Sequence, residues 1–136
     1  MPLIPAHESS PELVSLWSEA VHAARHKRGG PELLTTIRGG VDEEVLLEHL
    51  VDDHTVWLAV EDDELVGMAL YRDRVIEAVF VNSHHRRKGL ARMMVNTLKT
   101  LETPPKDALA LPGDRATKSL YESFGWKARL LTMHAE

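Results

Sequence analysis

The side chains best suited to bind a ligand lie in one short segment, SHHRRKGLAR, at residues 83–92. The segment follows a β-branched run that predicts a strand, and it opens an amphipathic run that predicts a helix. Gly89 at this turn lets the backbone approach a ligand closely, and the first N–H groups of a helix have no partner within it. Arg86, Arg87 and Lys88 add three cations just before the glycine. The segment therefore predicts an anion site suited to a diphosphate, although so short a pattern has low specificity alone.

Two other interpretations of the same segment are weaker. His84 and His85 could indicate a metal site, but neighbours on a turn rarely converge on one ion, and no further ligand follows at metal-site spacing. The cations could also contact nucleic acid, but the net charge of the chain is −5 and no aromatic residues are interleaved with them. We therefore expect no metal and no nucleic-acid partner.

The composition fits a single globular domain over residues 1–136, with 43% hydrophobic and 27% charged residues. The chain contains no cysteine, which excludes disulfides, thiolate metal sites and a cysteine nucleophile. No run approaches the roughly 20 apolar residues that a membrane span requires, and the start of the chain lacks the pattern of a signal peptide. We therefore expect a cytoplasmic protein with no membrane partner.

Charge is strongly segregated along the chain. Residues 41–64 carry ten acids and no lysine or arginine, whereas residues 65–136 carry twelve bases and seven acids, a net of +5. Solvated helix and turn surfaces account for many such runs. The segregation nevertheless favours one surface that attracts cations and another that attracts anions.

The rest of the sequence predicts the elements that position the basic segment. Ser9 and Glu12 have capping-box spacing, and the apolar period that follows predicts a helix closed near Gly29 and Gly30. Two β-type runs around residues 61–64 predict a hairpin. This order of elements predicts a mixed α/β domain of the α+β type. We expect strands at 2–6, 55–60, 65–71, 75–81, 107–111 and 126–133, and helices at 11–28, 31–40, 42–51, 89–101 and 114–124.

A second motif lies downstream, in DRATKSLYESFGW at residues 114–126. Its spacing is close to N-x-x-A-x-x-L-Y-x-x-x-G-F. Together with V-x-S-x-x-R-x-x-G-x-A at residues 81–91, it resembles the GNAT superfamily of acyl-CoA-dependent N-acetyltransferases. The resemblance covers nearly the whole chain. The two motifs at this separation are together a specific signal for the family, whereas neither motif is specific by itself. Asp114, Thr117 and Trp126 depart from the common residues, but no departure removes a catalytic side chain.

The resemblance implies a fold and a cofactor. The fold is a mixed, mostly antiparallel sheet flanked by about four helices, in which a central parallel pair, 75–81 and 107–111, is splayed to hold acetyl-CoA. Backbone groups of Val79, Phe80 and Val81 would bind the pantetheine and polarise the thioester carbonyl. Asp114 stands where members of the family hold the pantetheine arm or the acceptor. The pyrophosphate would be held by Arg86, Arg87, Lys88, Gly89, Leu90 and Ala91.

Two side chains are candidates for the chemistry of transfer. Tyr121 stands where many members of the family carry the tyrosine that protonates the CoA sulfur, although a tyrosine packed on its helix face has the same pattern. Glu77 is the one acid in VIEAVFV, and some members use a glutamate near this point, often through water, to deprotonate the amine. It could instead meet solvent or pair with Arg72 or Arg74. The lack of cysteine excludes an acyl-cysteine intermediate and favours direct transfer.

We therefore expect an N-acetyltransferase that moves an acetyl group from acetyl-CoA to a primary amine of a small molecule or peptide. The acids of residues 42–64, near the acceptor cleft of this fold, predict a cationic acceptor. The alternative is a non-catalytic acyl-CoA-binding or regulatory module of the same fold. A tRNA-directed enzyme is disfavoured by the acidic net charge. Members of the family are often dimers, so a homodimer is one arrangement that the sequence leaves open.

Overall fold

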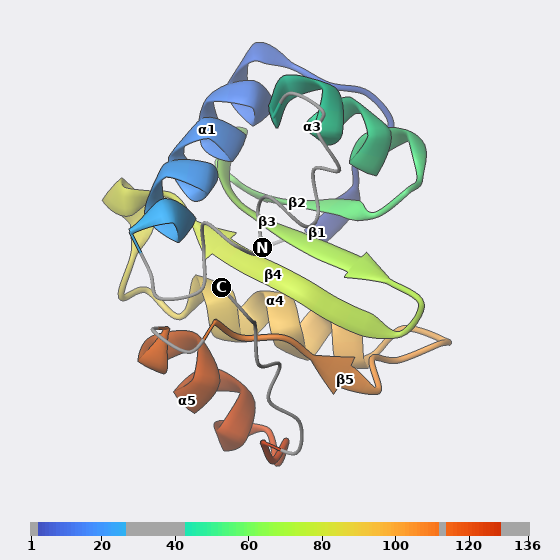
Figure 1. The fold of residues 1–136 in the computed structure, drawn as a ribbon, viewed down its shortest axis with the longest axis vertical. Coiled ribbons are helices and arrows are strands. Elements are labelled where there is room, and N and C mark those ends of the chain that lie inside the picture. The colour runs from blue at the N-terminus through green and yellow to red at the C-terminus, as the bar shows by residue number, and fades with distance from the viewer. Residues whose placement is uncertain (1–2, 27–42, 112–113, 129–136) are drawn as a thin grey trace, which may run out of the picture.

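The computed structural model describes residues 3–26, 43–111 and 114–128. These residues form a sheet with helices on both of its faces (Figure 1). The elements are β1 (Leu3–Pro5), α1 (Pro11–Arg25), α3 (Glu43–Asp52), β2 (Val56–Glu61), β3 (Glu64–Arg72), β4 (Val75–Val81), the 3₁₀ turn η1 (Ser83–His85), α4 (Leu90–Lys99), β5 (Asp107–Ala108) and α5 (Arg115–Ser123).

The sheet runs in the order β1-β2-β3-β4-β5, so each strand lies beside the one that precedes it in the chain. The pairs β1–β2, β2–β3 and β3–β4 are antiparallel, and the pair β4–β5 is parallel. The predicted mixed sheet, mostly antiparallel with one parallel pair and four flanking helices, is thus confirmed for the described residues. Within them, β5 is the outermost strand beyond β4. No helix among them is long and apolar enough to cross a membrane.

Alternate side chains of the strands pack on opposite faces of the sheet and form two cores. On one face, Leu13 and Trp17 of α1 and Leu47 of α3 pack against strand residues that include Val56 and Met68. Their helical spacing is the period that predicted these helices. The other face packs against α4 and α5, and its core contains Val66, Ala69, Ile76, Leu90, Met94, Val95, Leu98 and Tyr121.

Local sequence signals explain the element ends. Ser10 caps α1, because its hydroxyl accepts a hydrogen bond from Leu13 N–H at 3.1 Å, and Pro11 occupies the first turn. The predicted cap at Ser9 was therefore one residue early. The loop after α4 is attached to β3, because Tyr71 Oη donates a hydrogen bond to the carbonyl oxygen of Thr103 at 2.6 Å.

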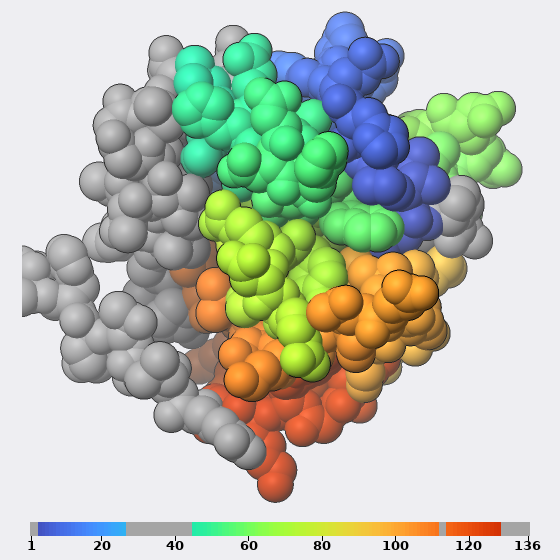
Figure 2. Space-filling model, turned by 90° about the vertical axis from the view of Figure 1, so that its right-hand side faces the viewer, coloured from blue at the N-terminus to red at the C-terminus, as the bar shows by residue number. Residues whose placement is uncertain are grey.

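The turn between β3 and β4 lies against the segment that leads into β5. Arg74 Nε donates to Pro104 O at 3.1 Å, and Lys106 N–H donates to Arg74 O at 2.7 Å. Figure 2 looks onto this side, where the yellow-green turn stands between α3 and the orange residues that follow α4. These bonds fix the start of β5 beside the start of β4.

Three expectations differ from the structure or lie outside it. The predicted strand at 107–111 is only Asp107–Ala108, because Leu109 N–H makes the last hydrogen bond to β4 and the chain then diverges from it. Residues 126–128 of the predicted last strand are not in a strand, and the rest of that segment lies outside the described residues. The predicted helical piece at 31–40 and the closing glycines at 29–30 also lie outside them.

Candidate functional site

The parallel strands β4 and β5 stay paired over only two residues. The last bond runs from Leu109 N–H to Ile76 O at 2.9 Å. β4 continues to Val81, whereas β5 ends at Ala108. Beyond Ile76 the two chains separate, as the resemblance predicted. Within the described part of the chain, the outer edge of β4 there has no strand partner, and Leu109 beside it is half exposed.

A β-bulge decides which backbone groups of β4 face the gap between β4 and β5. Leu70 of β3 lies opposite Ala78, but Tyr71 lies opposite Ile76, so Glu77 is an extra residue on β4. Such an insertion shifts the alternation of the strand by one residue. The bulge was not predicted, and the one signal for it was a lone glutamate in an apolar strand.

Beyond the bulge, Asn82 N–H donates to Val66 O of β3 at 2.8 Å. Because backbone groups alternate sides along a strand, those of Val79 and Val81 point away from β3 and into the gap. Those of Phe80 point toward β3. Val79 and Val81 therefore offer N–H donors and C=O acceptors to a ligand that lies along β4.

Arg86 joins this edge to the basic turn. Its Nε donates to Val81 O at 3.2 Å, and its guanidinium carbon lies 5.4 Å from the centre of the Phe80 ring. The hydrogen bond and the cation–π contact orient an otherwise exposed arginine. Arg86 is thus positioned where the open edge of β4 meets the start of α4.

The N-terminus of α4 is arranged as an anion site. Gly89 is its N-cap, with a φ of 78°, and no side chain caps the helix. Met93 N–H donates to Gly89 O at 3.0 Å, so the N–H groups before Met93 have no acceptor within the helix. Arg87 also has a left-handed φ, of 64°. Free N–H groups at the positive end of a helix dipole suit a phosphate.

The other predicted residues of this turn divide into exposed cations and anchors. Arg87 and Lys88 are exposed to solvent. Leu90 is buried and belongs to the same core as Met94, which fixes the start of α4 against the sheet. Ala91 is half-buried. The predicted diphosphate site therefore combines exposed cations with a helix start that Leu90 anchors in the core.

Tyr121 lies in the same core as Val79 and Val81, with 4% of its surface exposed. Its ring meets Trp126 edge to face, with ring centres 5.8 Å apart. Its hydroxyl is buried and has no hydrogen-bond partner in the part of the chain that the structure describes. Burial raises the pKa of Tyr121 well above its ordinary value, and the negative charge of Asp114 raises it further. The hydroxyl therefore keeps its proton at neutral pH.

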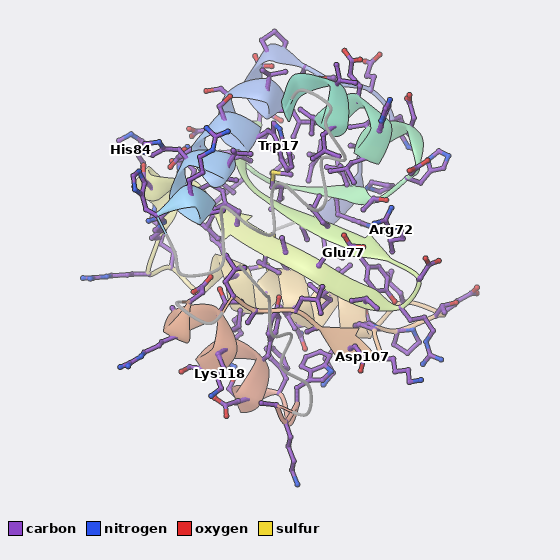
Figure 3. The ribbon with its side chains drawn as sticks, in the orientation of Figure 1. Trp17, Arg72, Glu77, His84, Asp107 and Lys118 are labelled. Carbon is purple, nitrogen blue, oxygen red and sulfur yellow. The ribbon has the colours of Figure 1, made fainter. Side chains whose placement is uncertain are left out.

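Glu77 is held by Arg72. Arg72 Nε and Nη2 both lie 3.0 Å from Glu77 Oε1, at the end of the β3–β4 hairpin (Figure 3). The sequence left open whether Glu77 pairs with Arg72 or with Arg74, and the structure shows Arg72. The Glu77 side chain is only 18% exposed, and the pair fixes its position in the bulge.

Asp114 caps α5. Its carboxylate accepts hydrogen bonds from Thr117 N–H at 3.1 Å and from Thr117 Oγ1 at 2.7 Å. The second motif thus includes a helix cap, as its position predicted. Asp114 also faces Tyr121 closely enough for its charge to act on the phenol.

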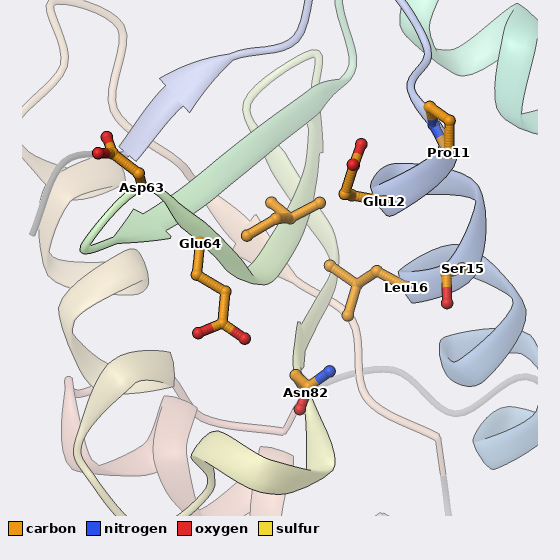
Figure 4. Close-up of a pocket in the computed structure, with 8 residues that line it drawn as sticks. Pro11, Glu12, Ser15, Leu16, Asp63, Glu64 and Asn82 are labelled. Atoms are coloured by element: carbon orange, nitrogen blue, oxygen red, sulfur yellow. The ribbon is translucent and has the colours of Figure 1, made fainter.

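A hollow of about 500 Å³ lies on another part of the surface (Figure 4). Its lining comes from the start of α1, from the β2–β3 turn and from the end of β4 at Asn82. Glu12, Asp63 and Glu64 make it acidic. Neither Tyr121 nor any residue of the basic turn lines this hollow, so it is distinct from the gap beside β4.

Comparison with known proteins places the chain in a family. A model of the GNAT acetyltransferase domain matches residues 18–132. The chain is 28% identical over 96 residues to the peptidyl-lysine N-acetyltransferase YjaB of Salmonella typhimurium. That match covers 70% of this chain and 61% of the relative, so the chain spans about three-fifths of that protein's length.

Solved structures share the fold. A ribosomal-protein-alanine N-acetyltransferase from Brucella melitensis superposes with a TM-score of 0.62 at 22% identity, covering 92% of this chain and 83% of that one. The aminoglycoside N-acetyltransferase AAC(6')-Iy in complex with CoA superposes with a TM-score of 0.59 at 11% identity, covering 99% and 93%. With the family match over most of its length, the chain belongs to the GNAT acetyltransferase family.

Proposed function

We propose that this chain transfers an acetyl group directly from acetyl-CoA to a primary amine of a peptide or small molecule. The observation that carries the proposal is the open edge of β4. Val79 and Val81 on this edge have no strand partner among the described residues, and they share a core with Tyr121, whose hydroxyl is buried. Arg86, bonded to Val81 O, joins the same edge to the uncapped start of α4. This combination would suit a ligand that carries a phosphate, an amide-rich arm and a thiol.

The residues present fit acetyl-CoA. The free N–H groups at the start of α4, with Arg86, Arg87 and Lys88 around them, would hold the diphosphate. Val79 and Val81 would pair with the amides of the pantetheine as a further strand would. The Tyr121 hydroxyl is buried without a hydrogen-bond partner among the described residues, a state that costs free energy unless a ligand supplies one.

Bound acetyl-CoA would supply an acyl carbon whose bond to sulfur is exchanged for a bond to the amine nitrogen. Val79 N–H points into the gap and would polarise the thioester carbonyl. Glu77 would accept the amine proton, directly or through water, and Tyr121 would donate its proton to the departing sulfur. The chain has no cysteine to carry the acetyl group, which supports one direct step.

A cationic amine is the acceptor that the charge pattern favours. Glu48, Asp52 and Asp53 are exposed on and after α3, and Asp63 and Glu64 are exposed in the β2–β3 turn. Such a field raises the local concentration of cations. The similar proteins are N-acetyltransferases named for a peptidyl lysine, a ribosomal-protein alanine and an aminoglycoside, all of which present an amine.

The test is thiol release from acetyl-CoA with four acceptors: a lysine peptide with a blocked N-terminus, a peptide with a free N-terminus, a polyamine and glutamate. We expect turnover with a cationic acceptor and a kcat/KM for glutamate at least about tenfold lower. Mass spectrometry of the product should show one added acetyl group. CoA binding without turnover of any amine would favour the non-catalytic module instead. Equal turnover of glutamate and the polyamine would refute the acceptor class alone.

A further inference from the structure

Two histidines lie together on the exposed side of α1, apart from the gap beside β4. His22 and His26 are four residues apart and so share one helix face. Their Nε2 atoms are 3.2 Å apart, and their rings meet edge to face with centres 4.5 Å apart. Both side chains are exposed to solvent. The two ring nitrogens are therefore already in contact at the surface.

This separation is the one that a shared metal ion requires. A late first-row metal binds imidazole nitrogen at about 2.0–2.1 Å. With an angle of about 90–110° at the metal, two such nitrogens stand about 2.9–3.4 Å apart. The observed 3.2 Å lies inside that range. We propose that His22 and His26 form a two-ligand site for a late first-row divalent metal ion.

The ligand set limits which ion fits. No group of three or more metal-ligating side chains converges among residues 3–26, 43–111 and 114–128. Glu19, one turn before His22, has its carboxylate bonded to Ser83 N–H at 2.8 Å and to Asn82 Nδ2 at 3.4 Å. Water would complete the coordination. Two imidazoles with open positions suit Cu²⁺ first, then Ni²⁺ and Zn²⁺, and do not suit Mg²⁺ or Ca²⁺.

The neighbouring pair His84 and His85 provides the contrast. His85 Nδ1 lies 3.4 Å from Asn82 Oδ1, and its Nε2 lies 3.5 Å from Glu64 Oε2. His84 is exposed on η1. The His85 ring is thus directed to Asn82 and Glu64. His84 and His85 form a matched control with the same two side chains in a different arrangement.

The pair lies in the part of α1 that packs beside η1, the turn that precedes the basic segment. Glu19, on the preceding turn, bonds to Ser83 at the start of η1, and α1 and η1 lie side by side in Figures 1 and 3. A metal that links His22 to His26 would hold the last turn of α1 in its helical form. Without a metal, the same contact is a hydrogen bond between the two rings.

The test uses protein without any purification tag, titrated calorimetrically with Cu²⁺ and Ni²⁺ and, as a control ion, Mg²⁺. We expect one saturable site per chain for Cu²⁺ and Ni²⁺ and none for Mg²⁺. Either His22→Ala or His26→Ala should weaken it about 100-fold, because a chelate becomes a single contact. The double change His84→Ala/His85→Ala should leave the affinity unchanged. Exposed alanines on a helix are tolerated, and an unchanged melting temperature without metal verifies that the variants fold.

A second readout locates the ion. Paramagnetic Cu²⁺ at a small fraction of the protein concentration should broaden the backbone amide signals of residues 19–26 before all others. Absence of saturable binding would overturn the proposal. So would binding that survives His22→Ala/His26→Ala or that is lost in the His84→Ala/His85→Ala control.

Discussion

Arg72 holds the carboxylate of Glu77 through two contacts of 3.0 Å to the same oxygen, Oε1. Because Glu77 is the extra residue of the β4 bulge, the pair fixes a carboxylate at the point where β4 and β5 begin to separate. An ion pair with an arginine 43% exposed contributes at most about 1 kcal/mol to stability. The pairing thus positions Glu77 more than it stabilises the fold.

Two variants of this pair distinguish a role of Glu77 as general base from a purely structural role. Glu77→Gln and Arg72→Gln both break the ion pair and should lower the free energy of unfolding by similar amounts, below about 1 kcal/mol. If Glu77 accepts the amine proton, only Glu77→Gln should lower kcat strongly, by about 10²–10⁴-fold. It should also flatten the acid side of the rate–pH profile.

Steady-state kinetics from pH 5 to 9 with one cationic acceptor would check this prediction. Equal, small losses of kcat in the two variants would assign Glu77 a structural role. An unchanged pH profile in Glu77→Gln would lead to the same conclusion.

Tyr121→Phe should change activity and stability in opposite directions. The substitution removes a buried hydroxyl without a described partner, so the free energy of unfolding should rise by about 1 kcal/mol. It also removes the proposed proton donor, so kcat should fall by about 10²–10⁴-fold. Urea unfolding and thiol-release kinetics measure the two effects.

The matched control is Tyr71→Phe, at the other tyrosine of the chain. Tyr71 Oη donates to Thr103 O at 2.6 Å, so its loss should destabilise the protein by about 1 kcal/mol with little effect on kcat. A Tyr121→Phe protein that is destabilised and still active would contradict the assignment of Tyr121.

The two tyrosines also predict an alkaline decline in stability. Burial raises the pKa of Tyr121 and of Tyr71, with Asp114 adding to the first effect and Arg74 opposing the second. Below the ordinary tyrosine pKa, about 10, both folded and unfolded chains keep these protons. Above it the unfolded chain releases them and the folded chain does not, so stability falls as pH rises. Each tyrosine contributes up to about 1.4 kcal/mol per pH unit there.

Urea titrations at pH 9, 10 and 11 would test this. Tyr121→Phe should lose less stability across this range than the wild type. If the two proteins decline in parallel, the hydroxyl of Tyr121 is not shielded as described.

The β2–β3 turn offers a test that concerns the fold alone. Asp62 and Asp63 have left-handed φ values of 50° and 63°, which glycine adopts without the cost that a side chain incurs. Asp63→Gly should therefore raise the free energy of unfolding by about 0.5–1 kcal/mol, as measured by urea unfolding. Asp53→Gly is the control, because Asp53 is not among the left-handed residues and glycine there should lower stability. A loss of stability in both variants would contradict the turn geometry.

The sequence predicted most elements because their signals are local. The apolar period of Leu13, Leu16 and Trp17 predicts α1. Asp62 and Asp63, both with left-handed φ values, lie where the hairpin turn of residues 61–64 was expected. The parallel pairing of 75–81 with 107–111 followed from the resemblance and is confirmed by Ile76 opposite Ala108. Element ends were less accurate, as the Ser10 cap shows.

The details of the site depended on contacts between distant segments. No local pattern fixes the bulge at Glu77, because it arises from the register of β4 on β3. The same register turns Val79 and Val81, rather than Phe80, toward the gap. The bond between Arg86 and Val81 likewise needs the turn of η1. The spacing of His22 and His26 was visible in the sequence, but only the structure shows that their nitrogens meet.

The most direct test of the central claim is the melting temperature of the protein with saturating acetyl-CoA, CoA or ATP. A ligand at 100 times its Kd stabilises the folded state by about 2.7 kcal/mol, which for a chain of this size raises the melting temperature by roughly 6–15 °C. We predict this rise with acetyl-CoA and with CoA but not with ATP, because in the proposed site the edge of β4 would bind the pantetheine arm, which ATP lacks. An equal rise with ATP would show that the basic turn binds any phosphate, and no rise with any of the three would contradict the cofactor site.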